Sequence, residues 1–71
     1  MKKSNVLLEN LKNKCDFKVI IEDYDFGVFE YCKEDECYHQ KETGWYTLSI
    51  DSIKRAIVDD NYFIKVEMEY K

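Results

Sequence analysis

Three turn signals divide residues 16–50 into four short segments in which apolar and polar side chains alternate. Alternation with a period of two is typical of strands that bury one face. The only two glycines predict three-residue hairpin loops at 25–27 and 42–44, because glycine readily adopts the left-handed conformation that such loops need. The charged run at 33–36 predicts the third bend. The sequence therefore indicates a four-stranded antiparallel meander.

The three turns give strand registers that agree with one another. The first loop places Ile21 opposite Tyr31. The bend places Tyr31 opposite Tyr38, and the second loop places Tyr38 opposite Leu48. All four side chains then share one face, whereas a slip by one residue would scatter this apolar stripe. Agreement between independent turns is the main support for the meander.

One helix is predicted before the meander in the sequence and one after it. A helix at 5–14, with Ser4 as its N-cap, has apolar residues at the spacing of one helix face: Leu7, Leu8, Leu11 and Cys15. Asp51 predicts the start of a second short helix, and the polar run at 59–61 predicts its end. One side of that second helix is apolar: Ile53, Ala56 and Ile57.

Residues 62–71 predict a final strand, because apolar residues there alternate with lysine and glutamate. This strand has two possible places, beside the first strand or at an exposed edge that could pair with another chain. The expected fold class is α+β, with the order α-β-β-β-β-α-β and two short helices packed on one face of the sheet. A chain of 71 residues is expected to form a single small domain, 1–71.

The charge of the chain is unevenly distributed and excludes several classes of function. The net charge is −4, and residues 16–36 contain eight acidic residues against two lysines. Arg55 is the single arginine, so no basic cluster suggests direct binding of nucleic acid. The first residues lack the long apolar run of a signal peptide or a membrane span. We therefore expect a cytoplasmic protein that binds neither nucleic acid nor membrane.

The acidic segment suggests a protein-binding function. Closely spaced carboxylates can imitate a row of phosphates, so we expect a partner protein with a basic, nucleic-acid-binding surface. An inhibitor encoded by a phage or mobile element would fit, since the richness in lysine, asparagine, isoleucine and glutamate is typical of low-GC bacteria and their phages. A merely solvated acidic face is the alternative. The expected contact residues are Glu22, Asp23, Tyr24, Asp25, Glu30, Glu34, Asp35, Glu36 and the aromatic anchor Trp45.

The segment "CKEDECYH", residues 32–39, supports a second hypothesis. The predicted register places Cys32, Cys37 and His39 on the outer face of the sheet, where they could form a metal- or thiol-based module. Zinc usually takes four ligands, and the remaining cysteine, Cys15, is expected to point into the core from the end of the first helix. The spacing is also not that of a zinc knuckle. We therefore expect free thiols, no cofactor, and a chain that is a monomer or a homodimer.

A catalytic function is not expected from these residues. Cys37, His39 and Glu30 supply a thiol, a base and an acid on one face, as nucleophilic catalysis requires. An open sheet face, however, offers neither a dry cleft nor an oxyanion hole. The chain also lacks a glycine-rich phosphate loop and the sequence signatures of serine hydrolases and metalloproteases.

Overall fold

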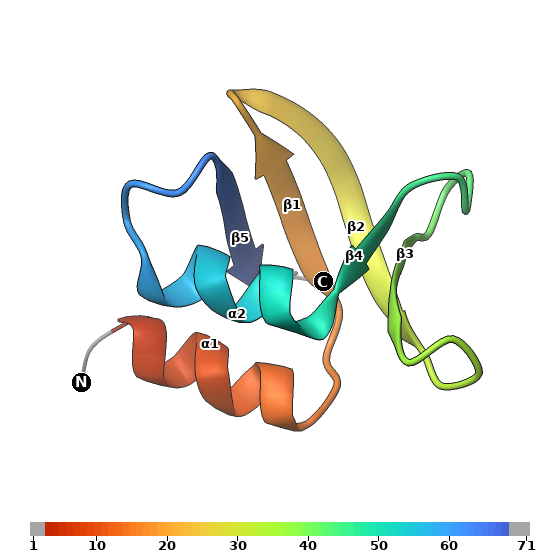
Figure 1. The fold of residues 1–71 in the computed structure, drawn as a ribbon, viewed down its shortest axis with the longest axis horizontal. Helices are drawn as coiled ribbons and strands as arrows, with labels where there is room; N and C mark the ends of the chain where they lie inside the picture. Colours follow the sequence, from red (N-terminus) through yellow and green to blue (C-terminus); the bar gives the residue numbers. More distant parts are fainter. Residues whose placement is uncertain (1–2, 69–71) are drawn as a thin grey trace.

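The computed structural model describes residues 3–68, with side chains from residue 5 onward, and contains two helices on one side of a curled five-stranded sheet (Figure 1). The elements are α1 (Lys3–Lys12), β1 (Phe17–Ile21), β2 (Tyr24–Cys32), β3 (Cys37–Gln40), β4 (Thr47–Ser49), α2 (Ile50–Val58) and β5 (Ile64–Met68). All neighbouring strands are antiparallel, in the order β4-β3-β2-β1-β5. The predicted α+β meander and its element order are confirmed.

The final strand lies beside the first strand and also forms an edge of the sheet. β5 pairs with β1 from Ile64 to Met68, and Ile64 and Val66 are buried as the alternation predicts. The predicted strand began two residues earlier, at Tyr62. Its last apolar residue, Tyr70, lies outside the described residues.

A single core lies between the sheet and the helices. Its largest fully buried side chains are Tyr38, Phe17, Phe29, Ile53 and Val19. Helix α2 packs against β4 and β5, and α1 packs against α2. Full burial of an aliphatic or aromatic side chain contributes about 1.5–3 kcal/mol, so these few residues dominate the stability of a small domain. Neither helix in the described part of the chain has the length and apolarity that crossing a membrane requires.

The β1–β2 hairpin differs from the predicted one. Its turn consists of Glu22 and Asp23, with φ of 49° and 68°, and it places Ile21 opposite Tyr24. Two successive positive φ angles are typical of the two-residue turn whose twist matches that of paired strands. The prediction of a loop at 25–27 was therefore wrong, since Gly27 belongs to strand β2 and not to the turn.

Charge and burial explain why the observed register is favoured. A loop at 25–27 would have placed Glu22 opposite Glu30, and like charges directly across a ladder are destabilising. The observed register places Phe17 opposite Phe29, and both side chains are fully buried. The two registers differ by an even number of residues, so the side chains of the regular ladder keep their predicted faces.

The other two hairpins have the predicted registers. Cys32 lies opposite Cys37, and Tyr31 opposite Tyr38, around the turn at 33–36. Tyr38 lies opposite Leu48, and Gly44 has the expected positive φ, 72°.

The observed helix ends differ from the sequence-based predictions in three ways. Ser49, not Asp51, caps α2, because its Oγ accepts a hydrogen bond from the backbone N–H of Ser52 at 3.1 Å. Helix α1 begins at Lys3, so Ser4 lies inside the helix and does not precede it. The turn that follows α1 contains Lys14 at φ 59°, and Cys15 beyond it is exposed and does not point into the core.

Candidate functional site

A groove of about 530 Å³ opens between the start of β2 and the loop that joins β3 to β4. We call it the aromatic groove. It is lined by Tyr24, Asp25, Phe26, Gly27, Gln40, Glu42, Thr43 and Tyr46. Four consecutive residues of one strand therefore form one wall, and the end of β3 with its following loop forms the other.

A β-bulge shapes the β2 wall. Asp25 lies opposite Ile20 and Gly27 lies opposite Val19, so Phe26 has no partner on β1. Gly27 has φ of 79°, a conformation that is strained for other residues. Its backbone N–H donates to Oδ1 of Asp25 at 2.8 Å, which closes the bulge. The extra residue thus changes the direction of the strand at the groove.

Three aromatic rings form a row along the groove. The ring centroids of Tyr24 and Phe26 are 4.9 Å apart, and those of Phe26 and Tyr46 are 5.2 Å apart in an edge-on arrangement. Tilted and edge-on contacts of this kind are the favourable geometries for aromatic pairs. Phe26 packs partly against the core, whereas Tyr24 and Tyr46 are 67% and 51% exposed. The two tyrosines therefore have ring surface to offer a ligand.

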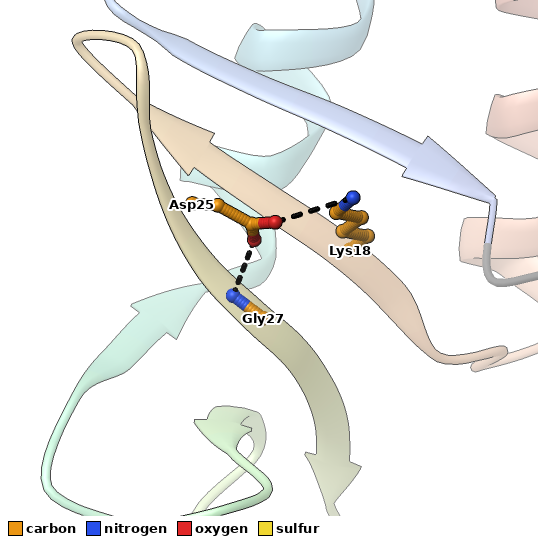
Figure 2. Close-up of polar contacts among 3 residues, drawn as sticks. All are labelled: Lys18, Asp25 and Gly27. Atoms are coloured by element: carbon orange, nitrogen blue, oxygen red, sulfur yellow. Dashed lines mark hydrogen bonds and ion pairs between the residues drawn. The ribbon is translucent and has the colours of Figure 1, made fainter.

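The carboxylate of Asp25 lies between Gly27 and Lys18 (Figure 2). Its Oδ2 is 3.2 Å from Nζ of Lys18. The backbone hydrogen bond from Gly27, followed by the contact with Lys18, lowers the pKa of Asp25 below its ordinary value of 3.8. Asp25 is therefore ionised at neutral pH and gives the groove a fixed negative charge.

Gln40 connects the two walls of the groove. Among the described residues it is the buried polar side chain. Its Nε2 donates to the carbonyl oxygen of Phe26 at 2.7 Å, and its Oε1 accepts a hydrogen bond from the hydroxyl of Thr43. The Thr43 hydroxyl in turn accepts from the backbone N–H of Trp45 at 3.1 Å. This network satisfies the buried amide and fixes the loop beside the bulge.

The structure divides the predicted contact residues between the two ends of β2. Tyr24 and Asp25 line the groove, and the turn at 22–23 directly precedes them. The acidic turn at 33–36 lies at the opposite end of the strand. Between the two ends, Glu30 is exposed opposite His39.

Trp45 lies in the β3–β4 loop and not in a strand as predicted. Its side chain is 86% exposed and does not line the groove. Sequence reasoning missed six lining residues: Phe26, Gly27, Gln40, Glu42, Thr43 and Tyr46. One signal was available, because Gln40 follows Tyr38 at the strand period and so occupies a core-face position that favours apolar residues.

A second group of polar side chains lies at the far end of β2. Donor atoms of Cys32, Asp35 and His39 lie within 4.8 Å of one another, and we call these residues the hairpin cluster. Cys37 lies opposite Cys32 in the ladder, but its thiol is not part of this cluster. Burial, followed by the charges of Asp35 and Cys32, raises the pKa of the Cys37 thiol above its ordinary value of 9.0. A thiol that stays protonated is a weak nucleophile.

No protein-family model, curated protein or solved structure matches the chain. Its fold defines a small α+β domain, and its surface has an open groove of aromatic rings and carboxylates. These groups are suited to binding: rings offer apolar and cation-attracting faces, and carboxylates offer hydrogen-bond acceptors and charge.

Proposed function

We propose that this chain is a small, non-catalytic module that binds a partner protein with a basic surface. The observation that carries the proposal is the aromatic groove, where two exposed tyrosines lie beside two carboxylates. Tyr24 and Tyr46 provide ring faces, while Asp25 and Glu42 provide negative charge. Tyrosine is a favoured anchor at protein interfaces, and carboxylates near the anchor favour a cationic partner.

The groove is suited to the side chain of a lysine or an arginine. A cation is attracted to an aromatic face when it lies within about 6 Å of the ring centroid. The chain makes such contacts itself, with Lys14 Nζ 5.0 Å from the Tyr31 centroid and Arg55 Cζ 5.1 Å from the Tyr62 centroid. Those are the cation–π contacts of the described residues, and neither involves a ring of the groove. The groove tyrosines can therefore accept a cation from a partner.

The carboxylates beside the rings can also form ion pairs with a partner. Asp25 and Lys18 form an exposed ion pair, and exposed pairs contribute little to stability. A partner's cation can replace Lys18 with little loss. Glu42 is exposed and forms no ion pair within residues 5–68, so its charge is available directly. Both carboxylates would also attract a basic surface before contact.

The finer proposal is that the partner surface normally holds nucleic acid. Carboxylates follow β2 from one turn to the other: Glu22, Asp23, Asp25, Glu30, Glu34, Asp35 and Glu36. Asp25 and Glu30 lie on the strand and the other five lie in its flanking turns, and such a row of negative charges can occupy a groove that otherwise binds phosphates. An inhibitor produced by a phage or mobile element would act in this way. The exposed Trp45 would add an anchor beside the groove.

The test is a capture experiment from a lysate of the native host. The wild-type chain is compared with a Tyr24→Ser/Tyr46→Ser variant and with a control, Phe63→Ser, whose aromatic ring is 53% exposed but does not line the groove. Circular dichroism first establishes that all three are folded. We expect the wild type and the control to retain the same basic protein and the groove variant to lose it.

Competition with duplex DNA tests separately whether the surface that the chain binds normally holds nucleic acid. If the captured surface normally binds nucleic acid, added DNA should reduce capture by the wild type. Capture that DNA leaves unchanged would remove the mimicry proposal and leave the protein-binding proposal intact. Equal capture by all three chains would show that the groove is not the contact surface.

A further inference from the structure

The turn between β2 and β3 brings three different metal-ligating side chains together. Cys32 is the last residue of β2, Asp35 lies in the turn at 33–36, and His39 is the third residue of β3. The thiol, carboxylate and imidazole donor atoms all lie within 4.8 Å of one another. This hairpin cluster is separate from the aromatic groove, which lies at the other end of the same strand.

The hairpin geometry explains the arrangement. Tyr31 and Tyr38 lie opposite each other on the core side of the sheet, so Cys32 and His39 lie on its outer side. The tight turn, in which Glu36 has φ of 54°, brings Asp35 over the outer face. As a result, Oδ2 of Asp35 lies 2.9 Å from Nε2 of His39.

The imidazole nitrogen at the centre of the cluster lacks a proper partner. Nε2 of His39 is enclosed, yet it makes no hydrogen bond of acceptable geometry with any described residue. Asp35 is close enough, but its oxygen does not lie where an imidazole N–H would donate. An enclosed polar atom without a hydrogen bond is costly and requires an explanation. A cation held between the nitrogen and the carboxylate would satisfy both.

We propose that the hairpin cluster binds one divalent transition-metal ion, Zn²⁺ by its donor chemistry, through Cys32 Sγ, an Asp35 oxygen and His39 Nε2. Zinc accepts this mixture of sulfur, nitrogen and oxygen ligands at about 2.0–2.3 Å. Donors of a tetrahedral site lie about 3.3–3.8 Å apart, so side-chain movements of about 1 Å would bring donors that now lie within 4.8 Å of one another into position. Three protein ligands leave a fourth position for water or for a donor from another molecule.

The first measurement uses the reduced wild-type chain and the fact that His39 is the only histidine. Its imidazole signals in an NMR spectrum are therefore unambiguous. Addition of Zn²⁺ should shift the Nε2 signal more than the Nδ1 signal and saturate at one ion per chain. Histidine signals that do not respond to Zn²⁺, or a response without saturation, would overturn the proposal.

The second measurement identifies the other ligands with Co²⁺ as a spectroscopic probe. The wild type should show a thiolate-to-cobalt charge-transfer band and the visible bands of a tetrahedral site. Cys32→Ser should abolish the charge-transfer band, and Asp35→Asn should weaken binding about tenfold or more. The matched controls Cys37→Ser and Cys15→Ser should leave the spectrum unchanged. Loss of the band in Cys37→Ser with retention in Cys32→Ser would contradict the assigned ligand set.

Discussion

The two ends of β2 form surfaces of different kinds from the same strand. At its start, a bulge and a two-residue turn present aromatic rings to a loop from another part of the sheet. At its end, a regular ladder and a four-residue turn hold polar side chains close together within one hairpin. The difference comes from one extra residue, Phe26, which interrupts the alternation at one end only. A single unpaired residue is sufficient to convert a regular strand into the wall of a groove.

The two surfaces also depend on different contacts. The groove requires that the β3–β4 loop stay beside β2, and Gln40 provides that connection. The hairpin cluster requires only the local register between Cys32 and Cys37. The groove should therefore be sensitive to changes that leave the cluster intact, whereas damage to the shared core should affect both.

The largest effect is expected from Phe29→Ala, which removes a fully buried ring from the middle of β2. The lost burial and the resulting cavity should lower the free energy of unfolding by about 3–5 kcal/mol. Urea denaturation followed by circular dichroism measures the change. A loss below about 1 kcal/mol would mean that Phe29 does not occupy the core position described here.

An intermediate effect is expected from Gln40→Leu, and it should be confined to the groove. The part-buried Phe26 carbonyl loses its donor, which costs about 1–3 kcal/mol, and the exposed Thr43 hydroxyl loses its acceptor but keeps its contact with the Trp45 N–H. Hydrogen exchange should accelerate at the amide of Gly44, which donates to the Gln40 backbone carbonyl. Amides in the Cys32–Cys37 part of the ladder should keep their protection. Faster hydrogen exchange at amides throughout β2 and β3 would show that the groove and the hairpin cluster do not respond independently.

A smaller effect is expected from Tyr38→Phe, near the hairpin cluster. The Tyr38 hydroxyl donates to the carbonyl of Cys15 at 3.3 Å, so its removal should cost about 0.5–1.5 kcal/mol at neutral pH. Burial, followed by the nearby Cys15, Asp16 and Tyr31, raises the pKa of Tyr38 from 10.0 to about 12. The folded state therefore favours the neutral phenol, and this stability is present below pH 10 and is lost as the pH rises towards 12.

Denaturation of both proteins at a series of alkaline pH values checks this expectation. The stability of the wild type should decline more steeply above pH 10 than that of Tyr38→Phe. Parallel declines in the two proteins would show that Tyr38 is not the group responsible.

The smallest effect is expected at the β1–β2 turn. Glu22 and Asp23 both adopt positive φ, which is unfavourable for glutamate and, although aspartate tolerates it better than most residues, is adopted most readily by glycine. Glu22→Asn combined with Asp23→Gly should therefore stabilise the protein by about 0.5–1 kcal/mol.

Gly27→Ala should instead destabilise the protein, because an alanine there is strained at φ of 79° although nothing lies within 4 Å of its Cβ. Thermal unfolding measures both, and destabilisation by the first change would favour a loop at 25–27.

Sequence patterns predicted the element order, the strand faces and two of the three hairpin registers. They succeeded where polar turns separate regular alternation, as between Cys32 and Cys37. They failed at the first hairpin because Gly27 indicates a positive φ without showing whether it lies in a turn or in a bulge. The choice depends on the burial of Phe17 and Phe29 against the whole core, which no local pattern contains.

The candidate site was less predictable than the fold. Tyr24 and Asp25 were expected to contact a partner, but the groove around them combines β2 with a loop about fifteen to twenty residues further along the chain. Phe26, the unpaired residue of the bulge, contacts Tyr46 of the β3–β4 loop, and residue spacing indicates neither the bulge nor the contact. In the hairpin cluster, Asp35 joins Cys32 and His39 through the shape of the turn, which residue spacing alone does not specify.

The central claim, that a basic partner is anchored by the aromatic groove and not by Cys32 and His39 of the hairpin cluster, is tested most directly by the dissociation rate of the captured partner. Surface plasmon resonance compares the wild type with the groove variant Tyr24→Ser/Tyr46→Ser and with the cluster variant Cys32→Ser/His39→Gln. Loss of interface anchors mainly accelerates dissociation, and an anchor contributes about 2 kcal/mol or more. We predict that the partner leaves the groove variant at least about tenfold faster and leaves the cluster variant at the wild-type rate. Unchanged dissociation from the groove variant, or acceleration confined to the cluster variant, would contradict the account.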